Sequence, residues 1–423
     1  MNFNRFLVLT GTVMVTVLAL TGCTGAPQGP SSTNAAACVV DPQAAATASL
    51  PARATRPLDK KTASVLDAAA LAGFHRAAAP GAIVAVQTPS GTWTKAYGVG
   101  DLDHTAMRTD DYFRIGSVTK TFTGTLILQL AQKGKLSLSD TIDKYVAGVP
   151  MGKKITLKML LNMTSGISSY TIDATWIDKY LQNPRQVFTP EQLVDEGLAL
   201  PRQFAPGAQF NYSNTNAVLL GQVVEKVTGT SYTAALKSQI LSPLGLKHTS
   251  MPSTAAIPVP HTQGFTLQGT PADKSARPVN ATDWSPTFGS YAGQMISTTS
   301  DLLAYGRALG TGQGLLDEAQ QVSRLASIPA KTGYGLGAGC IDGWFGHTGE
   351  IPGYNTTVYY DTTHDTTVVV MANSDIASGA CTTSQTMQDN LASSSGSCMS
   401  PAVRIFAFVS DVLGHKFTPN PMS

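Results

Sequence analysis

Segments with the pattern of β-strands lie near both ends of the chain, and the long stretch between them is helical in pattern. Near the start, two runs at 82–88 and 92–98 flank a Pro-Ser-Gly turn, which predicts a hairpin. Strand-like runs return after residue 333, whereas residues 156–309 are broken into helices by Pro and Gly. Because neighbouring strands tend to share a sheet, we predict that the N- and C-terminal strands form one antiparallel sheet flanked by helices. The fold is then mixed α/β (α+β), and the helical stretch between the strands is an inserted all-helical subdomain. The late strands are expected at 333–341, 344–346, 356–360 and 366–371, and helices at 62–79, 117–133 and 401–413.

The composition excludes several classes of protein. The chain has 423 residues, of which 13% are charged, and a net charge of +2. Soluble domains usually contain roughly 25% charged residues, and a nucleic-acid binder needs a concentrated basic face. We therefore expect a neutral globular protein with no nucleic-acid partner.

The N-terminus has the features of an exported protein. The apolar run Leu7–Leu20 is shorter than the roughly 20 residues that span a bilayer, but it suits a signal peptide. It ends in Leu20-Thr21-Gly22-Cys23, which resembles the lipobox of bacterial lipoproteins. The resemblance implies a signal peptide at 1–22, a lipid on Cys23 and attachment to the extracytoplasmic side of the cell membrane. The Ala-, Ser- and Pro-rich composition that follows predicts a flexible tether over 23–57.

The number of cysteines is consistent with an exported protein. The chain has five, an odd number, and a lipid on Cys23 would account for one of them. The other four, Cys38, Cys340, Cys381 and Cys398, would form two disulfides in an oxidising compartment. Three pairings are open, and the short loop between Cys381 and Cys398 favours that pair together with Cys38–Cys340. Metal ligation by cysteine is not expected, because no Cys-x-x-Cys pair occurs.

A single Ser-x-x-Lys motif, Ser117-Val118-Thr119-Lys120, begins one of the predicted helices. Residues three apart share a helix face, so the Lys120 amine can lie beside the Ser117 hydroxyl. A buried lysine has a lowered pKa and can act as a base. The amides of a helix N-terminus can stabilise developing negative charge. Taken alone, the motif could equally be an N-capping serine and an exposed lysine.

Two further motifs offer complementary chemistry. Tyr212-Ser213-Asn214 supplies a phenol that can move a proton beside a cation and an amide that can bind a carbonyl, although alone it reads as a turn. His347-Thr348-Gly349, on a predicted strand, supplies an imidazole and a hydroxyl for a substrate carboxylate. Its glycine would let a substrate backbone approach closely. A lone histidine is more often structural, so this motif is also weak by itself.

Together, and in this order, the three motifs resemble those of the penicillin-recognising serine hydrolases. The Tyr-x-Asn element is similar to that of the branch with class C β-lactamases, D-alanyl-D-alanine carboxypeptidases and esterases. Flanking segments such as Leu160–Ile167 and Met295–Leu302 extend the resemblance over about 58–414. It implies a β-lactamase/DD-peptidase-like domain at 58–418, with a helical insertion at roughly 125–310.

The resemblance also implies a role for each motif residue. Ser117 would be the nucleophile of an acyl-enzyme, with Lys120 and Tyr212 moving protons and no metal or organic cofactor. The backbone amides of Ser117 and Glu350 would form the oxyanion hole. The expected substrate contacts are Asn214, which would also orient Lys120, and His347, Thr348 and Gly349.

Histidine at position 347, where β-lactamases of this family carry lysine, affects the substrate prediction. An imidazole with a pKa near 6.5 would be only partly cationic at neutral pH, and Glu350 would add negative charge at the rim. The leading hypothesis is a lipid-anchored D-alanyl-D-alanine carboxypeptidase-like enzyme acting on cell-wall peptides. An esterase or amidase of the same family and a non-hydrolytic penicillin-binding-like envelope protein are the alternatives. An efficient β-lactamase is disfavoured.

Overall fold

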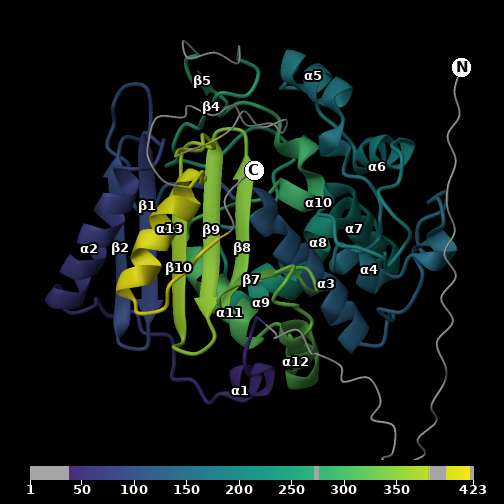
Figure 1. Cartoon of the computed structure of the whole chain (residues 1–423), viewed down its shortest axis with the longest axis horizontal. Helices are drawn as coiled ribbons and strands as arrows, with labels where there is room; N and C mark the ends of the chain where they lie inside the picture. The colour runs from purple at the N-terminus through teal and green to yellow at the C-terminus, as the bar shows by residue number, and fades with distance from the viewer. Residues whose placement is uncertain (1–37, 271–275, 380, 382–396, 420–423) are drawn as a thin grey trace, which may run out of the picture. The chain divides into compact units, whose positions relative to one another are not determined.

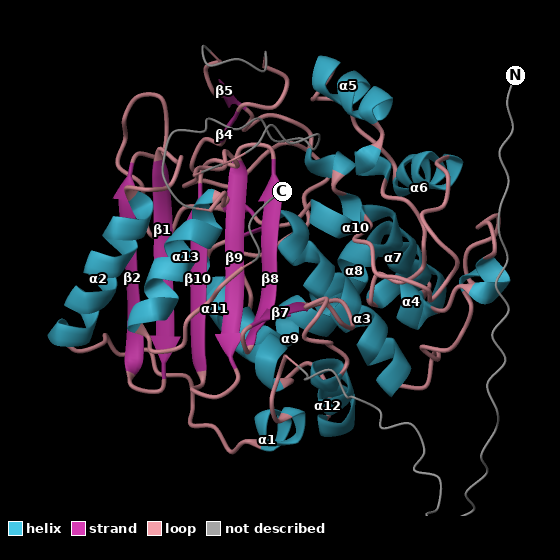
Figure 2. Ribbon diagram, in the orientation of Figure 1, coloured by secondary structure: helices cyan, strands magenta, loops and turns pink. Residues whose placement is uncertain are grey.

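A six-stranded antiparallel sheet forms the centre of the fold, and its strands come from both ends of the chain, as predicted (Figure 2). The computed structural model describes residues 38–270, 276–379, 381 and 397–419. The strand order in the sheet is β2-β1-β10-β9-β8-β7. The strands are β1 (Gly81–Thr88), β2 (Gly91–Gly98), β7 (Gly339–Ile341), β8 (Trp344–Ile351), β9 (Tyr354–Asp361) and β10 (Thr366–Ala372).

Helices cover both faces of this sheet (Figure 1). On one face lie α2 (Lys60–Phe74) and α13 (Pro401–Val412), and on the other lies α11 (Thr299–Thr311). The side chains of a strand alternate between its two faces, so Val84 packs towards α2 and α13 while Ile83 faces the opposite core. Apolar residues at successive positions of the central strands therefore supply two separate cores.

The helical subdomain lies beside the sheet and follows β2 in the chain (Figure 1). Its central helix is α3 (Thr119–Gln132), which is buried from Thr119 to Leu130 and packs against α7 (Asn214–Thr228). The other helices of this stretch are α4 (Leu157–Leu161), α5 (Ala174–Gln182), α6 (Pro190–Ala199), α8 (Tyr232–Leu236), α9 (Ser242–Leu244), α10 (Ser290–Gly293) and α12 (Glu318–Ala326). Two-residue strands form two small ladders, β3 (Phe113–Arg114) with β6 (Ile296–Ser297) and β4 (Phe265–Thr266) with β5 (Val279–Asn280).

Residues 38–47 pack on the domain, so the prediction of a flexible tether does not hold for this part of the chain, whereas residues 48–57 are mostly exposed and form no helix or strand. Asp41 caps the short helix α1 (Pro42–Thr47), which packs against α12. Val39 is only 1% exposed, and a disulfide joins Cys38 to Cys340. The disulfide and the burial of Val39 hold this segment in place, although its sequence has little propensity for regular secondary structure. The predicted signal peptide at 1–22 and Cys23 lie outside the described residues.

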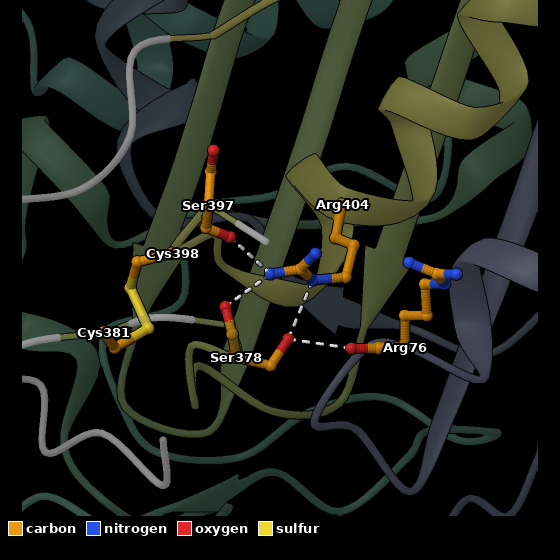
Figure 3. Close-up of a disulfide and its surroundings, with 6 residues drawn as sticks. All are labelled: Arg76, Ser378, Cys381, Ser397, Cys398 and Arg404. Atoms are coloured by element: carbon orange, nitrogen blue, oxygen red, sulfur yellow. Dashed lines mark hydrogen bonds between the residues drawn. A yellow bond between two sulfur atoms is a disulfide. The ribbon is translucent and has the colours of Figure 1, made fainter. Parts of the chain in front are cut away.

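The second disulfide joins Cys381 to Cys398, so the two pairs are those that the sequence favoured. Figure 3 shows how Arg404 of α13 fixes the chain beside this bond. The Arg404 guanidinium donates to the Ser378 hydroxyl at 2.8 Å and to the Ser397 carbonyl at 2.7 Å. The Ser378 hydroxyl in turn donates to the carbonyl of Arg76, which follows α2.

Several element boundaries differ from the sequence prediction, and the strand expected at 344–346 extends over Trp344–Ile351. The strand expected at 333–341 is reduced to β7, because Gly333 and Gly337 adopt positive φ angles of 62° and 73° and turn the chain. The helix expected to reach residue 79 ends at Phe74. Over the described ranges, none of the helices has both the length and the apolar character needed to cross a membrane.

Candidate active site

The start of α3 brings Ser117 and Lys120 together. A 3₁₀ turn, Gly116–Val118, leads directly into the helix, so the two residues lie on one face. Lys120 Nζ donates to Ser117 Oγ at 2.9 Å and to the backbone carbonyl of Ala292 at 2.9 Å. Ser117 remains partly exposed, whereas Lys120 is 2% exposed. The hydroxyl is therefore accessible from solvent, and the amine that contacts it is not.

Burial controls the protonation of Lys120. Loss of solvent around the amine lowers the pKa of Lys120 well below its usual range. Its hydrogen-bond partners in the structure, a hydroxyl and a carbonyl, are both uncharged. An uncharged amine beside Ser117 Oγ can accept the proton of the hydroxyl.

Tyr212 lies immediately before α7 and completes the proton-transfer group. Lys120 Nζ lies 4.8 Å from the centroid of the Tyr212 ring. Burial raises the pKa of Tyr212, and a side-chain hydrogen bond with Ser117 partly opposes this rise. The phenol is therefore neutral in the resting protein and can pass a proton without carrying a lasting charge.

The backbone amides of Ser117 and Glu350 lie close together, because two glycines allow β8 to contact the turn before α3. Gly116 has a φ of 49°, and a Cβ there would lie 2.4 Å from the Glu350 amide nitrogen. A Cβ on Gly349 would lie 1.9 Å from the Ile115 carbonyl oxygen. Gly349 was expected to admit a substrate backbone, but it is the protein's own backbone that approaches it.

His347 is buried and uncharged, which corrects the prediction of a partly cationic imidazole. Its side chain contacts the Thr348 carbonyl through Nδ1 and the Tyr334 hydroxyl through Nε2, the latter at 3.2 Å. Burial is the main cause that lowers the pKa of His347 to about 4, and Lys120 would add to this effect only in its protonated form. His347 therefore offers no cation to a substrate carboxylate at neutral pH.

Tyr334 is a member of this site that sequence reasoning missed. Its ring is perpendicular to those of His347 and Tyr212, with centroid distances of 5.5 and 5.8 Å. The available signal was a tyrosine between two glycines, Gly333 and Gly335, just before a strand. Flanking glycines predict a turn at this position, but they do not show that the Tyr334 side chain contacts His347.

A cleft of about 1070 Å³ is lined by Ser117, Tyr212, Asn214, Thr348 and Glu350, and it extends to His415 in the C-terminal segment. The Asn214 amide nitrogen donates to Oγ1 of Thr171, in the 3₁₀ turn Tyr170–Ile172, at 3.0 Å, and the hydrogen-bond partners of Lys120 are Ser117 and Ala292 and not, as expected, Asn214. Asn214 and Thr348 remain placed to contact a substrate.

Glu350 is not the charged rim residue that the sequence suggested. Burial, together with the negative charge of Asp375, raises the pKa of Glu350 well above its usual range. Asn355 Nδ2 lies 3.4 Å from Glu350 Oε2. The acid is therefore uncharged in the free protein, although Glu350 lines the cleft.

Metal-ligating side chains come together elsewhere in the described part of the chain, at Asp361, His364 and His415. In the register of β8 and β9, Asp361 pairs with Trp344 at one end, whereas Glu350 pairs with Asn355 near the other. The cluster thus lies at the other end of this ladder from Glu350, although His415 lines the far part of the same cleft.

Comparison with known proteins gives consistent matches. A family model described as Beta-lactamase matches residues 58–386. The structure is similar to that of a D-stereospecific amidohydrolase from Streptomyces sp., with 32% identity, a TM-score of 0.67 and coverage of 74% of this chain and 94% of that one. It is also similar to a D-amino acid amidase from Ochrobactrum anthropi SV3, with 25% identity, a TM-score of 0.63 and coverage of 74% and 90%.

Relatives found by sequence alone are longer than the matched region. The Bacillus subtilis protein PbpX is 27% identical over 66% of this chain, and the chain spans 66% of its length. The chain spans 44% of the length of the Staphylococcus aureus protein Flp, with 35% identity.

Proposed function

The chain belongs to the beta-lactamase family of serine hydrolases, and from this premise we propose that it is an amidohydrolase that acylates Ser117, with amides of D-amino acids as substrates. The observation that carries the proposal is the uncharged His347 beside an intact Ser117–Lys120 pair. A carboxypeptidase or β-lactamase must bind a substrate carboxylate, and such binding is strongest with a cation. An amide substrate has no such requirement.

The proposed acylation uses groups that are already in contact. Lys120 Nζ, uncharged through burial, accepts the proton of Ser117 Oγ, 2.9 Å away, as the oxygen attacks the substrate carbonyl. The amides of Ser117 and Glu350 stabilise the oxyanion, and losing one such donor reduces the rate by about 10²–10³. Tyr212 delivers a proton to the leaving amine, and a water molecule activated by Tyr212 then hydrolyses the acyl-enzyme.

Glu350 supports a substrate with a free α-amino group. Glu350 lines the cleft, and its own backbone amide is the proposed oxyanion donor. An ammonium group bound there would favour ionisation of the buried acid, because an opposite charge lowers the pKa of a carboxyl. The similarity to a D-stereospecific amidohydrolase agrees with this class of substrate.

The experiment compares substrates and covalent labels on the purified full chain. We expect hydrolysis of D-phenylalaninamide to exceed that of L-phenylalaninamide and of an acylated D-alanyl-D-alanine peptide. Intact mass should show one fluorophosphonate adduct, which Ser117→Ala removes and the matched surface variant Ser139→Ala retains. Faster release of D-alanine from the peptide would favour the carboxypeptidase hypothesis. Absence of both turnover and label would favour a non-hydrolytic binding protein.

Anchoring by lipid is a separate proposal. It is supported by the lipobox-like Leu20-Thr21-Gly22-Cys23 and by two disulfides, which suit an oxidising compartment outside the cytoplasm. We expect the expressed protein to partition with membranes and the Cys23→Ser variant to lose this partitioning. Membrane retention of that variant at the wild-type level would contradict the proposal.

A further inference from the structure

Three metal-ligating side chains meet where the β9–β10 hairpin contacts the C-terminal segment. Asp361 ends β9, His364 lies in the hairpin turn, and His415 follows α13. Nδ1 of His364 and Nδ1 of His415 each lie 2.7 Å from the same oxygen, Asp361 Oδ2. The two imidazoles thus converge on a single carboxylate oxygen from different segments of the chain.

Backbone amides hold the carboxylate in place independently of the two imidazole rings. Asp361 Oδ1 accepts hydrogen bonds from the backbone amides of Thr363 at 2.8 Å and His364 at 3.2 Å. The side chain is 2% exposed. Metal-ligating carboxylates are typically fixed by such outer hydrogen bonds, and here they leave Oδ2 directed at the imidazoles.

His415 is also fixed, whereas His364 keeps the cluster open to solvent. The His415 ring stacks on Trp344 with a centroid distance of 5.3 Å and an interplanar angle of 26°. Its Cε1 and Nε2 lie against Gly343, where a Cβ would be 3.0 and 3.2 Å from them, so Nδ1 is the nitrogen directed at Asp361. The His364 side chain is 60% exposed. An ion can therefore reach the cluster, and water can fill a remaining coordination position.

We propose that Asp361, His364 and His415 bind a divalent transition-metal ion, and that zinc fits this set best. Two imidazoles, one carboxylate and a water molecule form a common ligand set for Zn²⁺, and oxygen-preferring Mg²⁺ and Ca²⁺ do not favour imidazole. Tetrahedral zinc with bonds of about 2.0–2.1 Å places its ligand atoms roughly 3.3 Å apart. The 2.7 Å contacts therefore need to open by roughly half an ångström, which rotation of the exposed His364 and a small shift of Asp361 can supply.

Binding leaves the protons balanced. Because a carboxylate oxygen can only accept a hydrogen bond, the Nδ1 of each imidazole carries the proton in its contact with Asp361 Oδ2 when no metal is bound. On binding, each Nδ1 gives its lone pair to the ion, and the proton of that ring moves to Nε2 through solvent. The ion would join the β9–β10 hairpin to the C-terminal segment and, through the stacked Trp344, to the start of β8.

Calorimetry with the chelator-treated full chain tests the site, with Zn²⁺ as the probe. We expect one ion per chain with a micromolar or tighter dissociation constant, and at least about tenfold weaker binding by His364→Asn. His415→Phe retains a ring on Trp344, and the double variant His364→Asn/His415→Phe should lose the site. His75→Asn, which removes an exposed histidine elsewhere, should bind like the wild type.

A second measurement uses Co²⁺, whose visible absorption reports ligand number. An intense band typical of four-coordinate cobalt in the wild type, absent from the double variant, would support the proposal. Thermal unfolding of each variant without metal establishes that it is folded. Equal zinc binding by the wild type and a folded double variant would overturn the proposal, as would wild-type protein that binds less than one ion.

Discussion

The two ends of the β8–β9 ladder hold two clusters of ionisable groups that are organised in opposite ways. At one end, Lys120 is buried beside uncharged partners, and burial lowers its pKa. At the other end, burial raises the pKa of Asp361, but hydrogen bonds from His415, His364 and a backbone amide outweigh this effect and lower it overall. A buried group without a charged partner becomes reactive, whereas a buried group with several partners becomes a fixed part of the structure.

This difference leads to opposite expectations for the two ends. Substitutions near Ser117 should change the rate and leave stability unchanged or improved, because the fold gains nothing from an isolated buried amine. Substitutions around Asp361 should reduce stability and leave the rate unchanged. The following four predictions test this separation.

The largest effect is expected for Lys120→Met. We expect kcat/KM for D-phenylalaninamide to fall by at least about 10³, because the proton acceptor of Ser117 is lost. The variant should also unfold at a higher temperature at pH 7. The unfolded lysine keeps a proton that the native amine gives up, so Lys120 reduces stability at neutral pH, and this penalty diminishes as the pH rises towards 10.5.

Melting curves at pH 7 and pH 10 measure the change in melting temperature of Lys120→Met. The variant Lys153→Met, at an exposed lysine, is the matched control. A gain in melting temperature that is equal at both pH values would contradict the assigned cause. A rate within tenfold of the wild type would contradict the role of the amine.

Asp361→Asn should give the largest loss of stability. We expect about 1–3 kcal/mol less free energy of unfolding in the presence of a chelator, because the hydrogen bonds to a buried carboxylate are weakened. The pKa of Asp361 is lowered, so its contribution is complete above the unfolded pKa of 3.8 and is lost as the pH falls through the native value. Urea unfolding at pH 7 and pH 3 measures the loss of unfolding free energy and its dependence on pH. The value of kcat/KM should remain within about twofold of the wild type.

A loss of activity in Asp361→Asn as large as the loss in Lys120→Met would contradict separate roles for the two clusters. It would mean that the two ends of the ladder act as one unit. The conservative variant Asp361→Glu distinguishes charge from shape, because it keeps the carboxylate but displaces it.

Glu350→Gln should change selectivity more than rate. The preference for D-phenylalaninamide over its N-acetylated form should fall by about tenfold, because the amide cannot ionise beside the substrate ammonium. Paired kcat/KM values for the two substrates measure this ratio. An unchanged ratio would show that Glu350 does not contact the amino group.

The smallest effect concerns pH. Because the pKa of His347 is about 4, it does not titrate between pH 5 and 8. The ratio of kcat/KM for a carboxylate-terminated peptide to that for its terminal amide should therefore vary by less than about twofold over this range. A fall centred near pH 6.5 would instead indicate a cationic imidazole that binds the carboxylate.

Much of the fold was accessible from the sequence, because its signals are local. Strand-like runs bounded by turn residues marked the strands, and the i, i+3 spacing placed Lys120 beside Ser117, where the structure finds Nζ and Oγ 2.9 Å apart. Family resemblance placed Tyr212 in the same group, and the structure brings it there.

The features of the site that the sequence did not predict depend on tertiary packing. Nothing local to His347 shows that Tyr334 covers it or that its pKa falls. Likewise, Asp361 and His415 are far apart in the sequence and meet only because α13 returns to the sheet. Burial and long-range pairing, which decide charge and ligand sets, are not encoded in short motifs.

The bond between Cys38 and Cys340 closes a covalent ring across 302 positions. Ser117, Lys120 and Tyr212 all lie inside this ring, whereas His347 and Glu350 lie in the segment that follows it. A protease that cuts once within the ring opens it without releasing a fragment, so the nicked protein keeps its mass on a non-reducing gel. A chain with this topology can tolerate a cut in a surface loop and still hold both halves of its site together.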